Sequence, residues 1–171
     1  MRDVLETADQ LLVRAHFGYD LTGRASLWGG YGYTASLPIS GEVTHEHRVW
    51  QQFIWTGPVR GFVFTSRSRL EQRFFEASTT AWRVRQQVRV SRTVTSGSRL
   101  AAVAWNEVLL NLNSTARTVR GFDQNRAFAG LNLSIDRRSR VEFGYLNQFV
   151  NTPGRLDRRN HILSVVCVLA Y

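Results

Sequence analysis

The sequence is poor in features that mark several common classes of protein. It has one cysteine, Cys167, so no disulfide can form within the chain. No stretch approaches the roughly 18–20 consecutive apolar residues of a transmembrane helix, which excludes a helical membrane protein. A membrane β-barrel is not excluded, because its strands alternate lipid-facing and inward-facing residues and therefore average to mild hydropathy. The hydrophobic content of 43% and the mean hydropathy of −0.23 are compatible with such a barrel.

Lysine is absent, and all 22 basic residues are arginines. With 13 acidic residues, the formal net charge is +9. The arginine guanidinium is planar, permanently charged and well suited to carboxylate and phosphate partners. Nucleic-acid binders usually mix lysine with arginine, so we expect no nucleic-acid partner.

Alternation of apolar and polar residues with a period of two runs through most of the chain, whereas helical periodicity is poor. Turn-forming residues recur between the alternating segments. No linker divides the chain, so we predict an all-β fold in a single domain, residues 1–171. The nine predicted strands cover residues 9–20, 24–36, 46–56, 61–75, 80–93, 99–113, 122–135, 139–150 and 160–171.

Short and long connections tend to alternate along this series. Residues 21–24 and 57–60 are short connections, whereas residues 37–45 and 151–159 are long ones. In outer-membrane barrels, short turns face the periplasm and long loops face outward. The alternation therefore favours an antiparallel up-and-down transmembrane β-barrel.

The last predicted strand carries the sharpest local pattern. Every second residue back from the final Tyr171 is apolar, which gives the strand one apolar face that ends on an aromatic residue. This pattern resembles the carboxy-terminal signal by which barrels are recognised for assembly, although an ordinary buried strand is the alternative. The expected assembly-signal residues are Leu163, Val165, Cys167, Leu169 and Tyr171.

Charged and apolar residues occupy opposite faces of the predicted strands. A row of arginines facing lipid would cost about 2–4 kcal/mol per residue at the bilayer midplane, so we expect the charged rows to face the lumen. A ladder of arginine–carboxylate pairs would rigidify a narrow barrel. The excess of arginine leaves open an anion-selective lumen or a site for phosphate-bearing ligands. The candidate lumen residues are Arg67, Arg69, Glu71, Arg73, Arg83, Arg85, Arg89, Glu107, Arg126 and Glu142, with Arg14 and Arg48 on the same rows.

Three further patterns allow sharper hypotheses. His45 and His47 share one strand face and are a possible pair of metal ligands, but no third ligand is evident, so we predict a solvated loop and no metal. His161 and Ser164 invite comparison with lipases, yet residues three apart on a strand point to opposite faces. Tryptophans and tyrosines are candidates for interfacial girdles. These aromatic residues are Trp28, Trp50, Trp55, Trp82, Trp105, Tyr31, Tyr33, Tyr145 and Tyr171.

Several motifs in chain order resemble the DUF2490 family of bacterial outer-membrane proteins. The resemblance implies an exported barrel and no particular activity. The matching stretches are residues 9–14 (DQLLVR) with Gly18 and Tyr19, Gly30-Tyr31, residues 46–52 (EHRVWQQ), residues 67–73 (RSRLEQR), residues 82–85 (WRVR), Asn106-Glu107, residues 123–126 (DQNR) with Gly130, residues 144–148 (GYLNQ) and Asn160-His161.

The number of strands predicts that the barrel is incomplete in this chain. Members of the family have strand-like sequence before the first match, and barrels of one chain usually have an even number of strands. We therefore expect that this chain lacks one or three strands of a native barrel of ten or twelve. Residues 1–6 carry acids where a signal peptide needs an apolar stretch, so an exported chain must have been trimmed.

Taken together, the sequence predicts an outer-membrane barrel with a polar, arginine-rich lumen and a structural or anion-passage role. We expect no enzyme activity and no cofactor. The expected partners are outer-membrane lipid, the barrel-assembly machinery, and an anionic solute or lipopolysaccharide. The alternatives are a soluble or periplasmic ligand-binding barrel and a lipid-modifying enzyme of the outer membrane.

Overall fold

The chain folds into one antiparallel β-sheet in which each strand pairs with its neighbours in sequence. The structure is a computed structural model. It describes residues 10–36, 43–76, 79–95, 97–136, 138–154 and 156–169, with backbone alone at Gln10 and Leu169.

The predicted all-β, up-and-down architecture of nine strands is confirmed, and most strand ends lie within two or three residues of the predicted ones. The strand order in the sheet is the order in sequence. The strands are β1 (Gln10–Thr22), β2 (Ala25–Ser36), β3 (Thr44–Val59), β4 (Phe62–Phe75), β5 (Ala81–Thr93), β6 (Leu100–Asn111), β7 (Gly121–Ser134), β8 (Ser139–Val150) and β9 (Arg158–Leu169).

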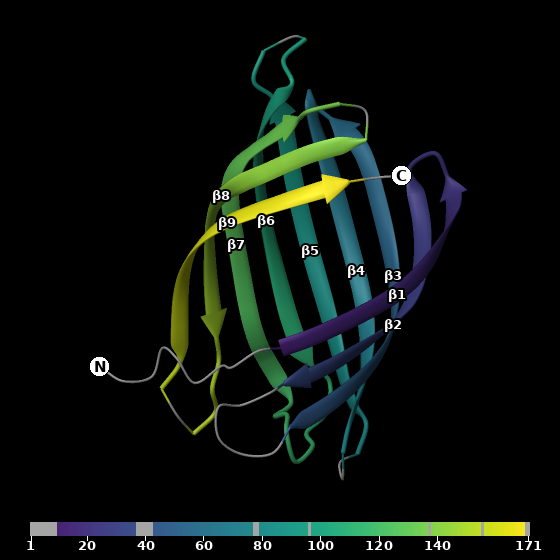
Figure 1. The fold of residues 1–171 in the computed structure, drawn as a ribbon, viewed down its shortest axis with the longest axis vertical. Helices are drawn as coiled ribbons and strands as arrows, with labels where there is room; N and C mark the ends of the chain where they lie inside the picture. The colour runs from purple at the N-terminus through teal and green to yellow at the C-terminus, as the bar shows by residue number, and fades with distance from the viewer. Residues whose placement is uncertain are drawn as a thin grey trace.

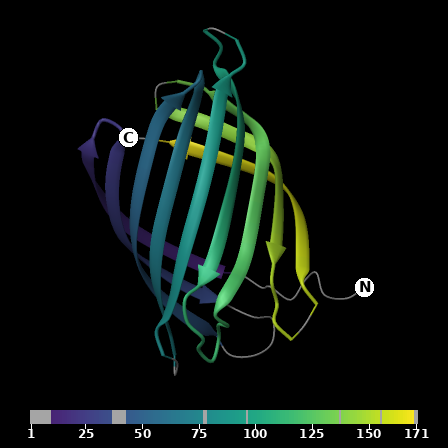
Figure 2. The ribbon, with the colours of Figure 1, turned by 180° about the vertical axis from the view of Figure 1, so that it is seen from behind.

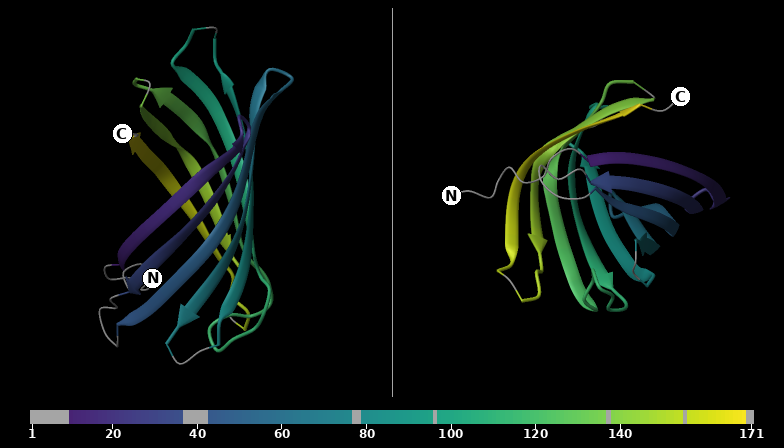
Figure 3. Two further views of the ribbon diagram at one scale, coloured as in Figure 1. Left: turned by 90° about the vertical axis from the view of Figure 1, so that its right-hand side faces the viewer. Right: turned by 60° about the horizontal axis from the view of Figure 1, so that its bottom comes forward.

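The sheet curves into an open barrel, with β1 and β9 as its two edges (Figures 1, 2 and 3). In the part of the chain that the structure describes, these edge strands do not pair with each other. The described residues also contain no helix long and apolar enough to cross a membrane. The expected native count of ten or twelve strands stays a prediction.

Ion pairs between strands that are not neighbours reveal which side chains lie on the concave face. Arg89 on β5 pairs with Glu142 on β8, across the two strands between them. Arg67 on β4 likewise reaches Glu107 on β6. Side chains can span intervening strands in this way only on the inside of a curved sheet. The predicted rows of charged residues therefore lie on the concave face, and the opposing apolar rows lie on the convex face.

The connections differ at the two ends of the sheet. Short turns join β1 to β2, β3 to β4 and β7 to β8 at the upper end in Figure 1, where the β5–β6 connection, residues 94–99, is longer. Most of the longer connections lie at the lower end. In the two-residue turn Arg60-Gly61, both residues have positive φ (49° and 80°), the geometry of a type I′ hairpin turn. We call the two ends the turn end and the loop end.

One short turn is held by a carboxylate. Asp136, between β7 and β8, accepts hydrogen bonds from the backbone N–H groups of Arg138 (2.6 Å) and Ser139 (2.7 Å). These two bonds stabilise the ionised carboxylate and lower the pKa of Asp136. An aspartate at this position thus closes the turn through its side chain.

A pair of glycines lets β7 and β8 approach each other closely on the concave face. Gly130 and Gly144 are directly paired in the sheet. A Cβ atom added to Gly130 would lie 2.2 Å from the carbonyl oxygen of Phe143 and 2.7 Å from the Phe128 ring. Because the closest atom belongs to the backbone, no side-chain rotation can make room.

We predict that Gly130→Ala lowers the free energy of unfolding by about 1–3 kcal/mol, because the added methyl group forces the two backbones apart. Chemical unfolding of the refolded protein, followed by circular dichroism, measures the change. Gly23→Ala is the control, since a Cβ atom there meets no atom within 4 Å. Equal stability of the two variants would contradict the close approach.

Candidate functional site

The carboxylate of Glu71 lies at the centre of the concave face and is fully buried. Arg83 donates to its Oε2 atom from Nη2 (2.5 Å) and Nε (2.9 Å). Arg85 donates to its other oxygen, Oε1, at 3.1 Å. Register explains the arrangement, because Glu71 and Arg83 are directly paired residues of β4 and β5. A buried carboxylate of this kind requires such charge-assisted partners.

Glu107 on β6 is the second buried carboxylate, and Arg85 joins it to Glu71. Arg85 Nη2 lies 2.7 and 2.8 Å from the two carboxylate oxygens of Glu107, while its Nη1 contacts Glu71. Arg67 also donates to Glu107, at 2.9 Å. The fixed fork of a guanidinium can hold two carboxylates at once, which a lysine ammonium does less well. We call Arg67, Arg69, Glu71, Arg83, Arg85 and Glu107 the central cluster.

Further ion pairs extend from the central cluster toward both ends of the sheet. At the loop end, Glu46 pairs with Arg48 (2.7 Å) and Arg73 (2.6 Å). At the turn end, Arg89 pairs with Glu142. Glu46 is not among the predicted lumen residues, because it lies between His45 and His47, where a solvated loop was predicted. The alternation along β3 identifies Glu46 as a concave-face residue, since Glu46, Arg48 and Gln52 are separated by even numbers of residues and therefore share one face of the strand.

Aromatic side chains pack among the charges of the concave face. The Arg69 guanidinium lies 4.1 Å from the centre of the Trp50 ring, and Trp105 stacks on Phe128 with centroids 5.4 Å apart. The expectation of interfacial girdles is therefore wrong for Trp28, Trp50 and Trp105, because strand pairing places all three on the concave face. A guanidinium that stacks on a ring can still donate hydrogen bonds in its own plane, as Arg69 does to Gln52, so arginine and tryptophan can be buried together.

The structure brings the predicted lumen residues together on one face. Arg126 belongs to the same face, at 3.8 Å from Glu107, and donates to Gln124. Of the predicted assembly residues, Leu163, Val165 and Cys167 share the convex face, and Leu163 is 85% exposed. The side chain of Leu169 and all of Tyr171 lie outside the described residues.

The predicted solvated loop at His45 and His47 is wrong, because both residues belong to strand β3 and pair with β2. His47 and His45 lie on the convex face, where their Nδ1 atoms form hydrogen bonds with Tyr31 (2.5 Å) and Tyr33 (2.6 Å). Within the described ranges, no group of three metal-ligating side chains occurs. His161 and Ser164 face opposite sides of β9, and His161 is hydrogen-bonded to Tyr145.

The central cluster separates two cavities on the concave face. The loop-end cavity, of about 580 Å³, lies among Arg73, Arg83 and the connections that follow β6 and β8. The turn-end cavity, of about 480 Å³, lies around Arg89, Asn132 and Arg140. Between them, the side chains of Glu71, Glu107 and Leu109 are fully or almost fully buried, so the middle of the concave face is packed.

These features define an open, up-and-down β-barrel whose concave face is filled by arginine–glutamate pairs with arginine in excess. The chain belongs to the family described as proteins of unknown function (DUF2490), whose profile matches residues 1–160. It is similar to an uncharacterized protein of Methylorubrum extorquens, with 34% identity over 167 residues. That match covers 95% of this chain and 73% of the relative. No solved structure matches the chain.

We predict that Glu71→Gln lowers the free energy of unfolding by about 3–5 kcal/mol, because Arg83 and Arg85 would remain buried without their shared carboxylate. Urea or guanidinium unfolding, followed by circular dichroism, measures the loss. Glu76→Gln removes the same charge from an exposed position beyond the end of β4 and is the matched control. A loss of similar size in both variants would show that net charge, and not the central cluster, sets the stability.

Proposed function

We propose that this protein is an integral outer-membrane β-barrel protein with an arginine-rich lumen that is packed with ion pairs at mid-height. The observation that carries the proposal is the contrast between the two faces of the sheet. The concave face holds the buried ion pairs, and the convex face exposes large apolar side chains such as Phe17, Phe53 and Leu163. An exposed apolar face of this extent is unfavourable in water, and contact with membrane lipid would remove it from water in a barrel.

The difference between the two ends of the sheet supports the same proposal. Outer-membrane barrels place short turns in the periplasm and long loops outside the cell. The tight turns at Gly23-Arg24 and Arg60-Gly61 lie at one end, and the longer connections 112–120 and 151–157 lie at the other. We infer that the turn end faces the periplasm and that β9 ends there, ready for the barrel-assembly machinery.

Polar residues on the convex face at mid-strand require an explanation in this proposal. They pair with each other across strands: Ser68 donates to Gln86 (2.5 Å), and the amides of Asn106 and Asn125 exchange two hydrogen bonds (3.2 and 3.0 Å). A polar group whose hydrogen bonds are satisfied costs much less to transfer from water than an unpaired one. Mutual pairing therefore allows these four side chains to face lipid.

Tryptophans on opposite faces provide a direct test. Trp55 and Trp82 lie on the convex face, and Trp50 lies on the concave face with 6% exposure. In variants that keep one tryptophan and replace the others by phenylalanine, refolded into vesicles, we expect lipids with brominated acyl chains to quench Trp55 and Trp82 emission strongly. Trp50 emission should change little.

Vesicles of the same lipid without bromine are the control for each variant. Quenching of Trp50 as strong as that of Trp55 would contradict the assignment of faces. Protein that stays monodisperse in buffer without detergent, and shows no quenching, would favour a soluble or periplasmic ligand-binding barrel instead.

Two roles fit this architecture, and the central cluster favours a structural one. The side chains of Glu71, Glu107 and Leu109 occupy the middle of the proposed lumen, and the loop-end and turn-end cavities lie on either side of them. The excess of arginine favours anion passage as the second candidate. The lipase comparison gains no support from the geometry, since His161 and Ser164 face opposite sides of β9.

Planar-bilayer recording separates the two roles. For protein whose folding is verified by circular dichroism, we expect no conductance steps, because the central cluster blocks the path. Reproducible steps with a preference for anions would overturn the structural role and support anion passage.

A further inference from the structure

The loop-end cavity is surrounded by more positive charge than the protein itself neutralises. Arg73, Arg83, Arg117 and Arg158 line it, whereas Asp123 is its one acidic lining residue among those the structure describes. Arg83 Nη1 lies 3.4 Å from Asp123, so that carboxylate already has a partner. Arg117 and Arg158 form no ion pair with any described residue, and both are exposed to the cavity opening.

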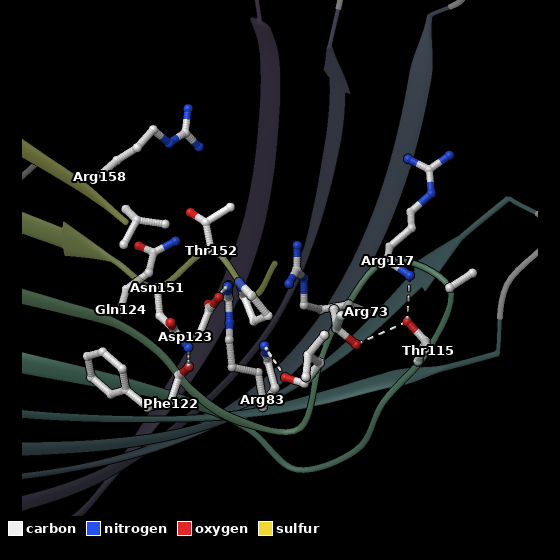
Figure 4. A pocket seen from close by; sticks show the side chains of 16 residues that line it. Arg73, Arg83, Thr115, Arg117, Phe122, Asp123, Gln124, Asn151, Thr152 and Arg158 are labelled. Carbon is white, nitrogen blue, oxygen red and sulfur yellow. Dashed lines mark hydrogen bonds and ion pairs between the residues drawn. The ribbon is translucent and has the colours of Figure 1, made fainter. Parts of the chain in front are cut away.

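The arginines have a defined arrangement around this cavity. Figure 4 shows Arg117 and Arg158 on opposite sides, with Arg73 and Thr152 between them. The guanidiniums of Arg73 and Arg117 both lie against the Phe75 ring, 4.8 and 5.6 Å from its centre. Stacking of this kind orients a guanidinium and leaves its in-plane N–H groups able to donate. Arg73 already donates from Nε and Nη2 to Glu46, whereas Arg117 has no acidic partner among the described residues.

A second polar group among the lining residues also lacks a partner. The hydroxyl oxygen of Thr152 is buried and makes no hydrogen bond with the described part of the chain. Burying a hydroxyl without a partner costs free energy, so such a group in a native structure calls for an explanation. A ligand that accepts or donates a hydrogen bond at Thr152 would provide it.

Size and chemistry together define the class of ligand. A cavity of about 580 Å³ lies within the range of sites for small organic molecules. Planar guanidiniums on two sides favour an oxyanion that accepts several hydrogen bonds, as a phosphate group does. Asn111, Gln124 and Asn151 line the same cavity. The amide nitrogens of Asn111 and Asn151 donate to backbone carbonyl groups and the amide oxygen of Gln124 accepts two hydrogen bonds, so the remaining amide atoms are the ones suited to hydroxyls.

We propose that the loop-end cavity binds a phosphorylated sugar, whose phosphate group is attracted by the unpaired arginines at its opening, Arg117 and Arg158. The phosphorylated sugar is either a free solute or the headgroup of a lipid in the surrounding membrane. This binding site adds to the proposed function. It rests on the proposed function in one respect, which is that the ligand enters from the side of the long loops. Binding to the folded protein in detergent does not require that the protein span a membrane.

Calorimetric titration of the full chain, refolded in detergent, tests the site with glucose 6-phosphate as the probe. We expect binding of glucose 6-phosphate and none of glucose at the same concentration. The double variant Arg117→Gln with Arg158→Gln should weaken the affinity by at least about tenfold, since charge-assisted hydrogen bonds to the phosphate are lost. Thr152→Val should weaken it by a smaller factor.

The chain offers closely matched controls for both arginines. Arg120 lies on the same connection as Arg117, and Arg159 follows Arg158, yet neither lines the cavity. The double variant Arg120→Gln with Arg159→Gln removes the same charge and should keep the parent affinity. An equal loss in both double variants, or equal binding of glucose and glucose 6-phosphate, would overturn the site.

A second titration distinguishes the two sources of the sugar phosphate. It uses micelles that contain lipid A, and lipid A without its phosphates is the comparison. Binding of lipid A that Arg117→Gln with Arg158→Gln weakens, without binding of glucose 6-phosphate, would assign the site to the lipid headgroup. Absence of both interactions, in protein whose tryptophans are quenched by brominated lipid, would overturn the site and leave the membrane proposal standing.

Discussion

The structure depends on the burial of two carboxylates, Glu71 and Glu107, beneath arginines of neighbouring strands. Removing these groups from water is costly, and Arg85 compensates for both at once by contacting each carboxylate with a different part of its guanidinium. Such a bridge requires β4, β5 and β6 to present these side chains on one face, and the pairing of Arg67 with Glu107 across β5 brings that face to the inside of the curved sheet. Successive side chains of a strand point to opposite faces of the sheet. Once the charged residues face inward, the apolar residues that alternate with them must face outward, so burial of the two carboxylates also accounts for the apolar convex face.

The central cluster also divides the concave face into regions of different chemistry. Toward the turn end, Arg89 finds its carboxylate on Glu142, three strands away. Toward the loop end, Glu46 is shared by Arg48 and Arg73, while Arg117 and Arg158 have no acidic partner among the described residues. Arginines without an acidic partner therefore face the cavity at the end with the longer connections. Among proteins of the DUF2490 family, that end is where we would look first for a ligand.

How far prediction succeeds depends on which physical rule fixes a feature. The faces of the strands follow from parity alone, so the inward rows from Arg67 to Arg73 and from Arg83 to Arg89 could be assigned in advance. Parity also identifies Trp50 and Glu46 as inward residues, because they share it with Arg48. Residue type suggested otherwise, since tryptophan is common at membrane interfaces and the flanking histidines resembled a loop. At such positions the strand geometry prevails over the preference of a residue type.

The sequence by itself determined the nine strands, their order and the opposite character of the two faces. These features depend on local alternation and short connections, which adjacent residues specify. Only the tertiary structure decided that Arg89 meets Glu142, that Gly130 lies against Gly144, and that Arg73, Arg117 and Arg158 surround one cavity. These contacts depend on the curvature of the sheet and on the register of every intervening strand pair. Alternation has the same period for every curvature, so it cannot specify which inward residues meet.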